Sequence, residues 1–312
     1  MAPRYPLRLI EVDLPIRRIS AHARREKSIR HGHISTLHIW WARRPLAACR
    51  AVICASLWPD PADELCPPLF FETARRLMLE WTSHERQMLL SPESRVRFEK
   101  ARRDHAFFDD DLELRGALLD FIADFSNWDN STVYEFLETS RALTQAAYKA
   151  LGGAPETRPL VVDPFAGGGS IPLEALRVGA DAFASDLNPI PVLINKVISE
   201  YIPKYRHLLV EEVSRWGKWI KQEAEKKLSV FYPKDPDRST PIAYLWARTI
   251  ICDGPGCGVE VPLIRSLWLA KRPGNSVALQ IIPRPESKSV DFQVIVIAPA
   301  TKHANLSCCI SD

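Results

Sequence analysis

The residues with the clearest chemical potential are the glycine-rich turn Asp163–Ser170 and a later aspartate, Asp186. A short apolar run at 160–162 precedes the turn and predicts a buried strand. Glycines let a backbone approach a ligand closely, and the helix that follows offers free N–H groups. An acid after the next strand, 182–184, is placed to hold ribose hydroxyls. The order of strand, turn, helix, strand and acid predicts the nucleotide-binding half of a doubly wound α/β sheet.

Dinucleotides are one ligand class for such a turn. Their fingerprint has the spacing G-x-G-x-x-G, and its last glycine allows close packing of helix on strand. Counted from Gly167 and Gly169, that last position is Pro172. The spacing therefore disfavours a dinucleotide.

The turn resembles the D-P-F-x-G-x-G-S/T sequence of amino-group methyltransferases that use S-adenosylmethionine. In that family the glycine loop lies under the methionine part of the cofactor, and the acid after the second strand binds the ribose. The resemblance implies that S-adenosylmethionine is the cofactor. The matching cofactor-binding positions are Asp163, Pro164, Phe165, Gly167, Gly169, Asp186 and Asn188.

Positive charge gathers at the front of the chain, although the net charge of the whole chain is only +3. Between Arg17 and Arg50 the only acid is Glu26. Arginines neutralise phosphates, and flat tryptophan and guanidinium faces stack on bases, so this stretch predicts contact with DNA. The alternative is a solvated basic helix face with the tryptophans in the core. The candidate nucleic-acid-binding residues are Arg24, Arg25, Arg30, Trp41, Arg43 and Arg44.

The stretch from Ile10 to Ala51 resembles DUF1156, the N-terminal domain of a bacterial and archaeal family of adenine-specific DNA methylases with an embedded zinc ribbon. Residues 125–131 and 161–196 resemble the same family, so the resemblance extends from Ile10 to about Arg272. In DNA amino-methyltransferases, a helix that opens with a basic residue and proline packs against the methionine end of the cofactor. The run that begins at Arg43 is similar to that helix.

A cysteine pair, Cys252 and Cys257, flanks a glycine-proline turn. Two thiolates held in this way form one knuckle of a zinc site, but structural zinc takes four ligands. Family members supply a second pair, whereas this chain offers only the adjacent Cys308 and Cys309, which are wrongly spaced for a knuckle. The pair predicts half of a zinc site, and the alternative is a metal-free turn.

The family's catalytic motif, D/N/S-P-P-Y/F/W, does not occur in this sequence. Methylation of an exocyclic base nitrogen needs such a loop to hold the amino group and stack on the flipped base. The nearest match, residues 66–69, has the two prolines but neither the polar start nor the aromatic end. We therefore expect a truncated adenine-N6 DNA methyltransferase that is inactive alone and pairs with a separate C-terminal catalytic fragment. The alternatives are a non-catalytic nucleic-acid-binding module and an RNA guanine-N2 methyltransferase.

The composition, 46% hydrophobic and 25% charged, is typical of a globular protein. No apolar run approaches the roughly 18 residues of a membrane span, and the odd number of cysteines favours a reducing, cytoplasmic setting. We expect an α/β fold with an incomplete Rossmann-like methyltransferase core. The expected order is a basic DUF1156-like segment (1–58), a helical region (59–155), the cofactor-binding part with following helices (156–240), a half zinc ribbon (241–272) and an unassigned tail (273–312).

Overall fold

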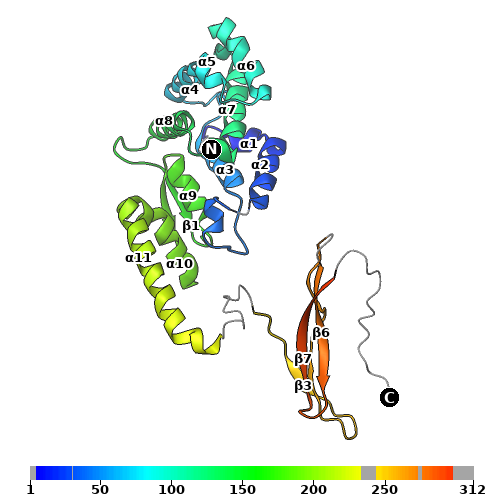
Figure 1. Ribbon diagram of the computed structural model, residues 1–312. Coiled ribbons are helices and arrows are strands. Elements are labelled where there is room, and N and C mark those ends of the chain that lie inside the picture. The colour runs from blue at the N-terminus through cyan, green and yellow to red at the C-terminus, as the bar shows by residue number, and fades with distance from the viewer. Residues whose placement is uncertain (1–4, 30, 233–243, 273–275, 298–312) are drawn as a thin grey trace. The chain divides into compact units, whose positions relative to one another are not determined.

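The computed structural model describes residues 5–29, 31–232, 244–272 and 276–297 (Figure 1). Contacts divide the chain into two units, residues 1–220 and 221–312. The described part is a mixed α/β structure with many helices and small sheets. None of its helices is both long and apolar enough to cross a membrane.

The first unit begins with a helical body, as the pattern over residues 59–155 predicts. Within it, α7 starts after Asp110, whose carboxylate accepts the N–H groups of Leu112 and Glu113. Short 3₁₀ turns occupy Ile34–Thr36, His105–Asp109 and Trp128–Asn130. The helices are α1 (Leu9–Val12), α2 (Ile16–Ser28), α3 (Leu46–Leu57), α4 (Pro68–Glu80), α5 (His84–Gln87), α6 (Pro92–Arg103), α7 (Asp111–Phe125) and α8 (Tyr134–Ala150).

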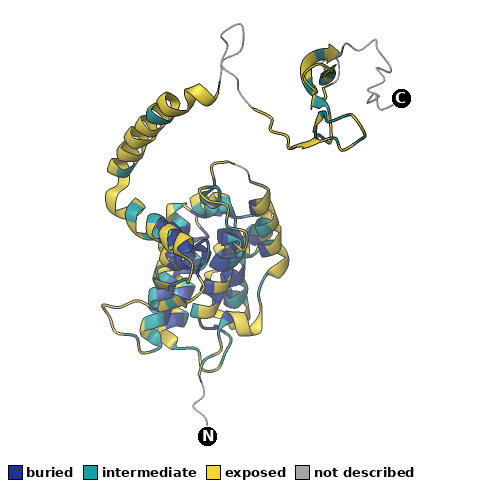
Figure 2. Cartoon of the chain, turned by 90° about the horizontal axis from the view of Figure 1, so that it is seen from below, coloured by how far each residue is buried: buried dark blue, intermediate teal, exposed yellow. Residues whose placement is uncertain are grey.

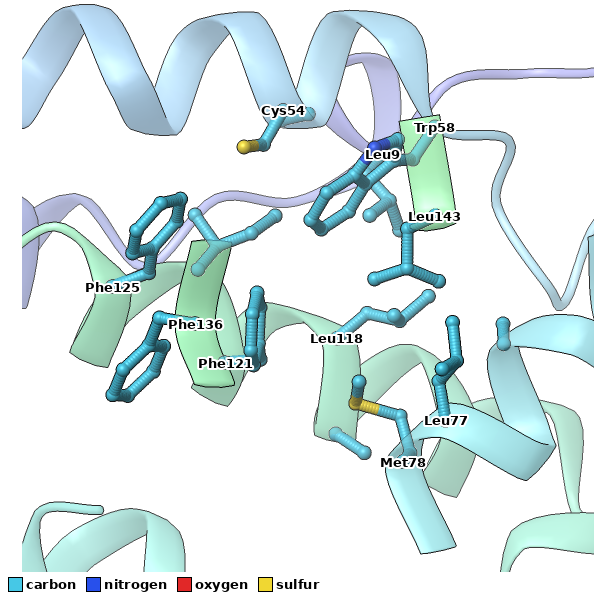
Figure 3. Packing of buried hydrophobic residues seen from close by; sticks show 14 of the residues in the cluster. Leu9, Cys54, Trp58, Leu77, Met78, Leu118, Phe121, Phe125, Phe136 and Leu143 are labelled. Atoms are coloured by element: carbon cyan, nitrogen blue, oxygen red, sulfur yellow. The ribbon is translucent and has the colours of Figure 1, made fainter. Parts of the chain in front are cut away.

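Aromatic side chains fill the centre of this helical body. Figure 3 shows Phe121, Phe125 and Phe136 side by side from α7 and α8. The rings of Trp81 and Phe136 lie 4.5 Å apart between centroids. The indole N–H of Trp81 donates to Thr139 at 3.1 Å, and that of Trp58 is satisfied in the same way by a threonine of α8. The core therefore buries large rings without leaving these indole donors unpaired.

The glycine turn connects a parallel pair of strands, β1 (Leu160–Asp163) and β2 (Asp181–Ala184), through α9 (Ser170–Arg177). These three elements confirm the predicted order of strand, turn, helix and strand. The register places Leu160 opposite Asp181. Ala175 and Val178 join the same apolar cluster as the helical body, so α9 fastens the sheet to that body.

Helices continue after β2 to the end of the first unit. α10 (Pro189–Lys196) leads through a π-helical turn, Val197–Tyr201, into α11 (Ile202–Leu228), which crosses the boundary between the units. The 3₁₀ turn Ser229–Phe231 follows. No residue of α11 is buried, and Figure 2 shows the helix in the colours of exposed and intermediate residues.

After the end of α11 and the 3₁₀ turn, the described part of the second unit is formed by antiparallel strands. β3 (Thr249–Ile251) pairs with β4 (Glu260–Pro262). A three-stranded sheet has the order β5–β6–β7. These strands are β5 (Trp268–Ala270), β6 (Ser276–Arg284) and β7 (Ser289–Ile297).

Candidate functional site at the glycine turn

The three glycines of the turn are required by its backbone and by close neighbours. Gly169 has φ of 76°, in the left-handed region that favours glycine. A Cβ at Gly167 would lie 2.8 Å from Nε1 of Trp40, and a Cβ at Gly168 would lie 2.5 Å from Nε of Arg43. Any side chain at these two positions would displace the residues that pack on the turn.

The start of the turn is tied to both strands. The buried Asp163 carboxylate accepts the N–H of Phe165 at 3.1 Å, which closes a tight turn after β1. The carbonyl of Pro164 accepts the hydroxyl of Ser185, which follows β2, at 3.2 Å. Phe165 itself is 81% exposed and leaves an apolar ring at the mouth of the turn.

The carboxylate of Asp186 lies directly beside the turn. One oxygen accepts the N–H of Gly167 at 2.9 Å, and the other accepts the N–H of Asn188 at 2.9 Å. These hydrogen bonds lower the pKa of the Asp186 carboxyl, and the one from Asn188 has the larger effect. A carboxylate offers about four lone-pair sites, so Asp186 can accept further hydrogen bonds from hydroxyl groups. Asn188 caps α10 by accepting the N–H of Ile190 at 3.0 Å.

Asn195 of α10, which the sequence does not point to, holds the glycine turn through side-chain hydrogen bonds. Its amide nitrogen donates to the carbonyl of Gly167 at 3.1 Å and to that of Pro191 at 2.8 Å. Its buried Oδ1 has no hydrogen-bond partner among the described residues and would lie 2.7 Å from a Cβ at Gly169. A single asparagine inside a helical pattern gives no sequence signal for this role.

The chain from Trp40 to Arg44, here named the tryptophan-arginine turn, packs against the glycine turn. A terminal nitrogen of Arg43 donates to the carbonyl of Gly168 at 2.7 Å, and the hydroxyl of Ser170 donates to the carbonyl of Arg44 at 2.7 Å. Burial lowers the pKa of Arg43. The positions therefore divide into two sets: Trp40 and Arg43 face the glycine turn, whereas Trp41 and Arg44 are exposed.

A buried ion pair joins α3 to α9. The guanidinium of Arg50 contacts Glu174 through two nitrogens, at 2.6 and 3.2 Å, and the two residues are 1% and 0% exposed. Arg177 also contacts Glu174, and Arg50 donates to the carbonyl of Phe125. Arg50 thus belongs to the interior, although its sequence context places it in a basic surface stretch. The spacing of 124 residues to its partner gives no local signal.

Residues 13–80 match a family described as "Protein of unknown function (DUF1156)". This confirms the DUF1156 resemblance for residues 13–51, and the match continues to residue 80, past the boundary expected at residue 58. The matched stretch includes α2, α3 and the tryptophan-arginine turn. No curated protein and no solved structure matches the chain. Residues 13–80 are called the DUF1156 segment below.

The arginines of the DUF1156 segment have different surroundings. Arg24 is exposed and has no ion-pair partner within the described ranges, whereas Arg25 pairs with Asp129 at 2.7 Å. Arg18 is drawn inward by Asp120 and Asp124. Arg30 lies outside the described residues. Trp41 is 87% exposed, so the alternative that both tryptophans lie in the core is wrong for this residue.

Cys252 and Cys257, the pair that predicts half of a zinc site, lie in the turn between β3 and β4. The N–H of Cys252 donates to the carbonyl of Val259 at 2.8 Å, and the N–H of Cys257 donates to that of Gly254 at 3.0 Å. No group of three or more metal-ligating side chains occurs in the part of the chain that the structure describes. Structural zinc takes four ligands, and Cys308 and Cys309, the other cysteines considered as ligands, lie outside the described residues.

Proposed function

We propose that the first unit is the S-adenosylmethionine-binding part of an adenine-N6 DNA methyltransferase. The observation that carries the proposal is the hydrogen bond from the Gly167 N–H to Asp186, which sets a carboxylate beside a glycine turn between parallel strands. This supports a Rossmann-like methyltransferase core in which Asp186 binds the ribose. Adenine as the target rests on the resemblance to the adenine-specific methylase family.

The residues present fit this cofactor. The three glycines of the turn carry no side chains of their own, although Trp40, Arg43 and Asn195 pack against them. α9 begins at the end of the turn, so N–H groups of its first helical turn can face an anionic group. The Nε of Arg43 is buried and has no hydrogen-bond partner among the described residues. We assign the Arg43 guanidinium and the start of α9 to the methionine carboxylate, and Asp186 to the ribose hydroxyls. When bound, S-adenosylmethionine supplies an electrophilic methyl group.

The proposed nucleic-acid surface is the outward side of the DUF1156 segment. Trp41, Arg44 and Arg24 are exposed and can meet bases and phosphates without breaking a contact within the protein. Arg25 remains a candidate, but its ion pair with Asp129 must open or be shared. Arg43 belongs to the cofactor site in this proposal, because its guanidinium is directed to the carbonyl of Gly168.

The proposed partner is a separate catalytic fragment that carries the D/N/S-P-P-Y/F/W motif and further strands. Parallel sheets are normally covered on both faces, and two strands are too few for a stable sheet. Among the described residues, β1 and β2 pair only with each other. Their side chains Leu160, Val162 and Phe183 are exposed. A strand-bearing partner would cover them and supply the catalytic loop.

Calorimetric titration of the full chain with S-adenosylmethionine tests the cofactor site. We expect Asp186→Ala to weaken binding about 10- to 100-fold, because a hydrogen-bonded charged group is lost. The control is Asp181→Ala, an exposed aspartate at the opposite end of β2, which should leave the affinity unchanged. A folded wild-type chain that shows no binding, or that binds NAD instead, would contradict the proposal.

A further inference from the structure

Glu26 is the only acid between Arg17 and Arg50, and its carboxylate is buried at 7% exposure of the residue. A buried carboxylate requires partners that replace its water. Its two oxygens accept the N–H groups of Leu46 at 2.9 Å and Ala47 at 3.0 Å. Glu26 of α2 therefore caps the start of α3 from a distance of 20 residues in sequence.

This cap replaces one that the local sequence does not provide. The residue before α3 is Pro45, and no side chain next to it caps the helix. The first N–H groups of a helix lack intrahelical partners, and the positive end of the helix favours an anion. Without Glu26, only water could accept hydrogen bonds from the N–H groups of Leu46 and Ala47.

The capped residues directly follow the tryptophan-arginine turn. Arg43 and Arg44 precede Leu46 by three and two positions and make the hydrogen bonds to Gly168 and Ser170. The charge of Glu26 also favours the charged form of the half-buried Arg43. The other anchor of α3 to α9, Arg50 on Glu174, lies one helical turn further on and does not hold the chain before the helix.

We propose that Glu26 is a positioning residue that holds the tryptophan-arginine turn against the glycine turn. The consequence of this role rests on the proposed function. If the glycine turn binds S-adenosylmethionine, its affinity for that cofactor depends on the position of α2. Because α2 also carries Arg24 and Arg25, nucleic acid bound to α2 and cofactor bound at the glycine turn would influence each other reciprocally. Glu26 touches neither ligand and acts through α3.

Hydrogen exchange of the ligand-free full chain tests the positioning role. In Glu26→Ala we expect exchange to rise at least about tenfold at Leu46 and Ala47 and also at the amides of residues 167–170, since a charged cap is lost. Glu26→Gln keeps an acceptor oxygen and should show a smaller rise at both places. The control is Glu72→Gln, an exposed acid of the same DUF1156 segment, which should change neither. Exchange within α7 and α8 should stay constant in all three variants.

Titration of the same variants with S-adenosylmethionine separates this inference from the proposed function. Affinity that falls in the order wild type, Glu26→Gln, Glu26→Ala supports both. Faster exchange at 167–170 in a chain whose wild type binds no S-adenosylmethionine supports the positioning role and overturns the cofactor. Faster exchange at Leu46 and Ala47 with unchanged exchange at 167–170 overturns the positioning role, because Glu26 is then only a helix cap.

Discussion

The helical body and the two-stranded sheet of the first unit differ in how far their apolar residues are buried. In the body, Phe121 of α7 is fully buried among other aromatic rings (Figure 3). In the sheet, Phe183 of β2 is 56% exposed, and Leu160 and Val162 of β1 are exposed with it. The two regions have similar residue types, so the difference lies in what covers them.

The sheet is covered where α9 lies and open elsewhere. Ala175, Val178 and Ala180 are buried in the same apolar cluster as the helical body. α9 thus joins a self-sufficient core to a sheet whose apolar side chains still lack neighbours. The hydrophobic fraction of 46% does not distinguish the helical body from the sheet, because it counts buried and exposed apolar residues alike.

The largest expected effect comes from truncating one phenylalanine in each region. Phe121→Ala should lower the free energy of unfolding of the first unit by about 3–5 kcal/mol, because it removes a buried ring and leaves a cavity. Phe183→Ala, with the same change at an exposed site, should cost less than about 1 kcal/mol. Urea unfolding followed by tryptophan fluorescence measures both. Equal losses would mean that the sheet is covered as the body is.

The junction between the regions gives an intermediate effect. Arg50→Met leaves the Glu174 carboxylate buried with Arg177 as its remaining cation, so we expect a loss of roughly 2–3 kcal/mol, below the ~3–5 of a fully broken buried pair. The matched control is Arg76→Met on α4, whose ion pair with Glu80 is exposed and worth about 0.5 kcal/mol or less. The same urea titration compares them, and equal effects would mean that the α3–α9 junction adds nothing.

Local patterns predicted much of this structure. The strand predicted at 160–162, the helix after the turn and the second strand all depend on neighbouring residues, and all three are present. The expected burial of the first strand is wrong, because Leu160 and Val162 are exposed. Patterns of this kind carry their signal within a few residues. The position of Asp186 beside the glycine turn also follows from local order, because the carboxyl ends of adjacent parallel strands meet at one edge.

The contacts that complete the candidate site could not be predicted in this way. The pairs Arg50–Glu174, Arg43–Gly168 and Glu26–Leu46 join residues far apart in sequence, and each arginine or glutamate also suits a surface helix. Periodicity assigns a residue to a helix face but does not identify the partner of that face. The division between inward Arg43 and outward Arg44 became visible only through their contacts.

The third prediction compares Arg43, which is packed against the glycine turn, with its exposed neighbour Arg44. Arg44→Gln removes an exposed cation and should reduce the slope of log affinity for duplex DNA against log salt by about 0.9, which is roughly fivefold in affinity near 0.15 M salt. Arg43→Gln removes a guanidinium that is committed to Gly168, so the slope should stay constant while S-adenosylmethionine binds more weakly. Fluorescence anisotropy of a labelled duplex across a salt series measures the slopes.

The two variants remove the same charge from adjacent positions, so a difference in total charge cannot explain a difference between their slopes. Equal changes in slope would place both arginines on the nucleic-acid surface, and no change in either would remove this turn from it.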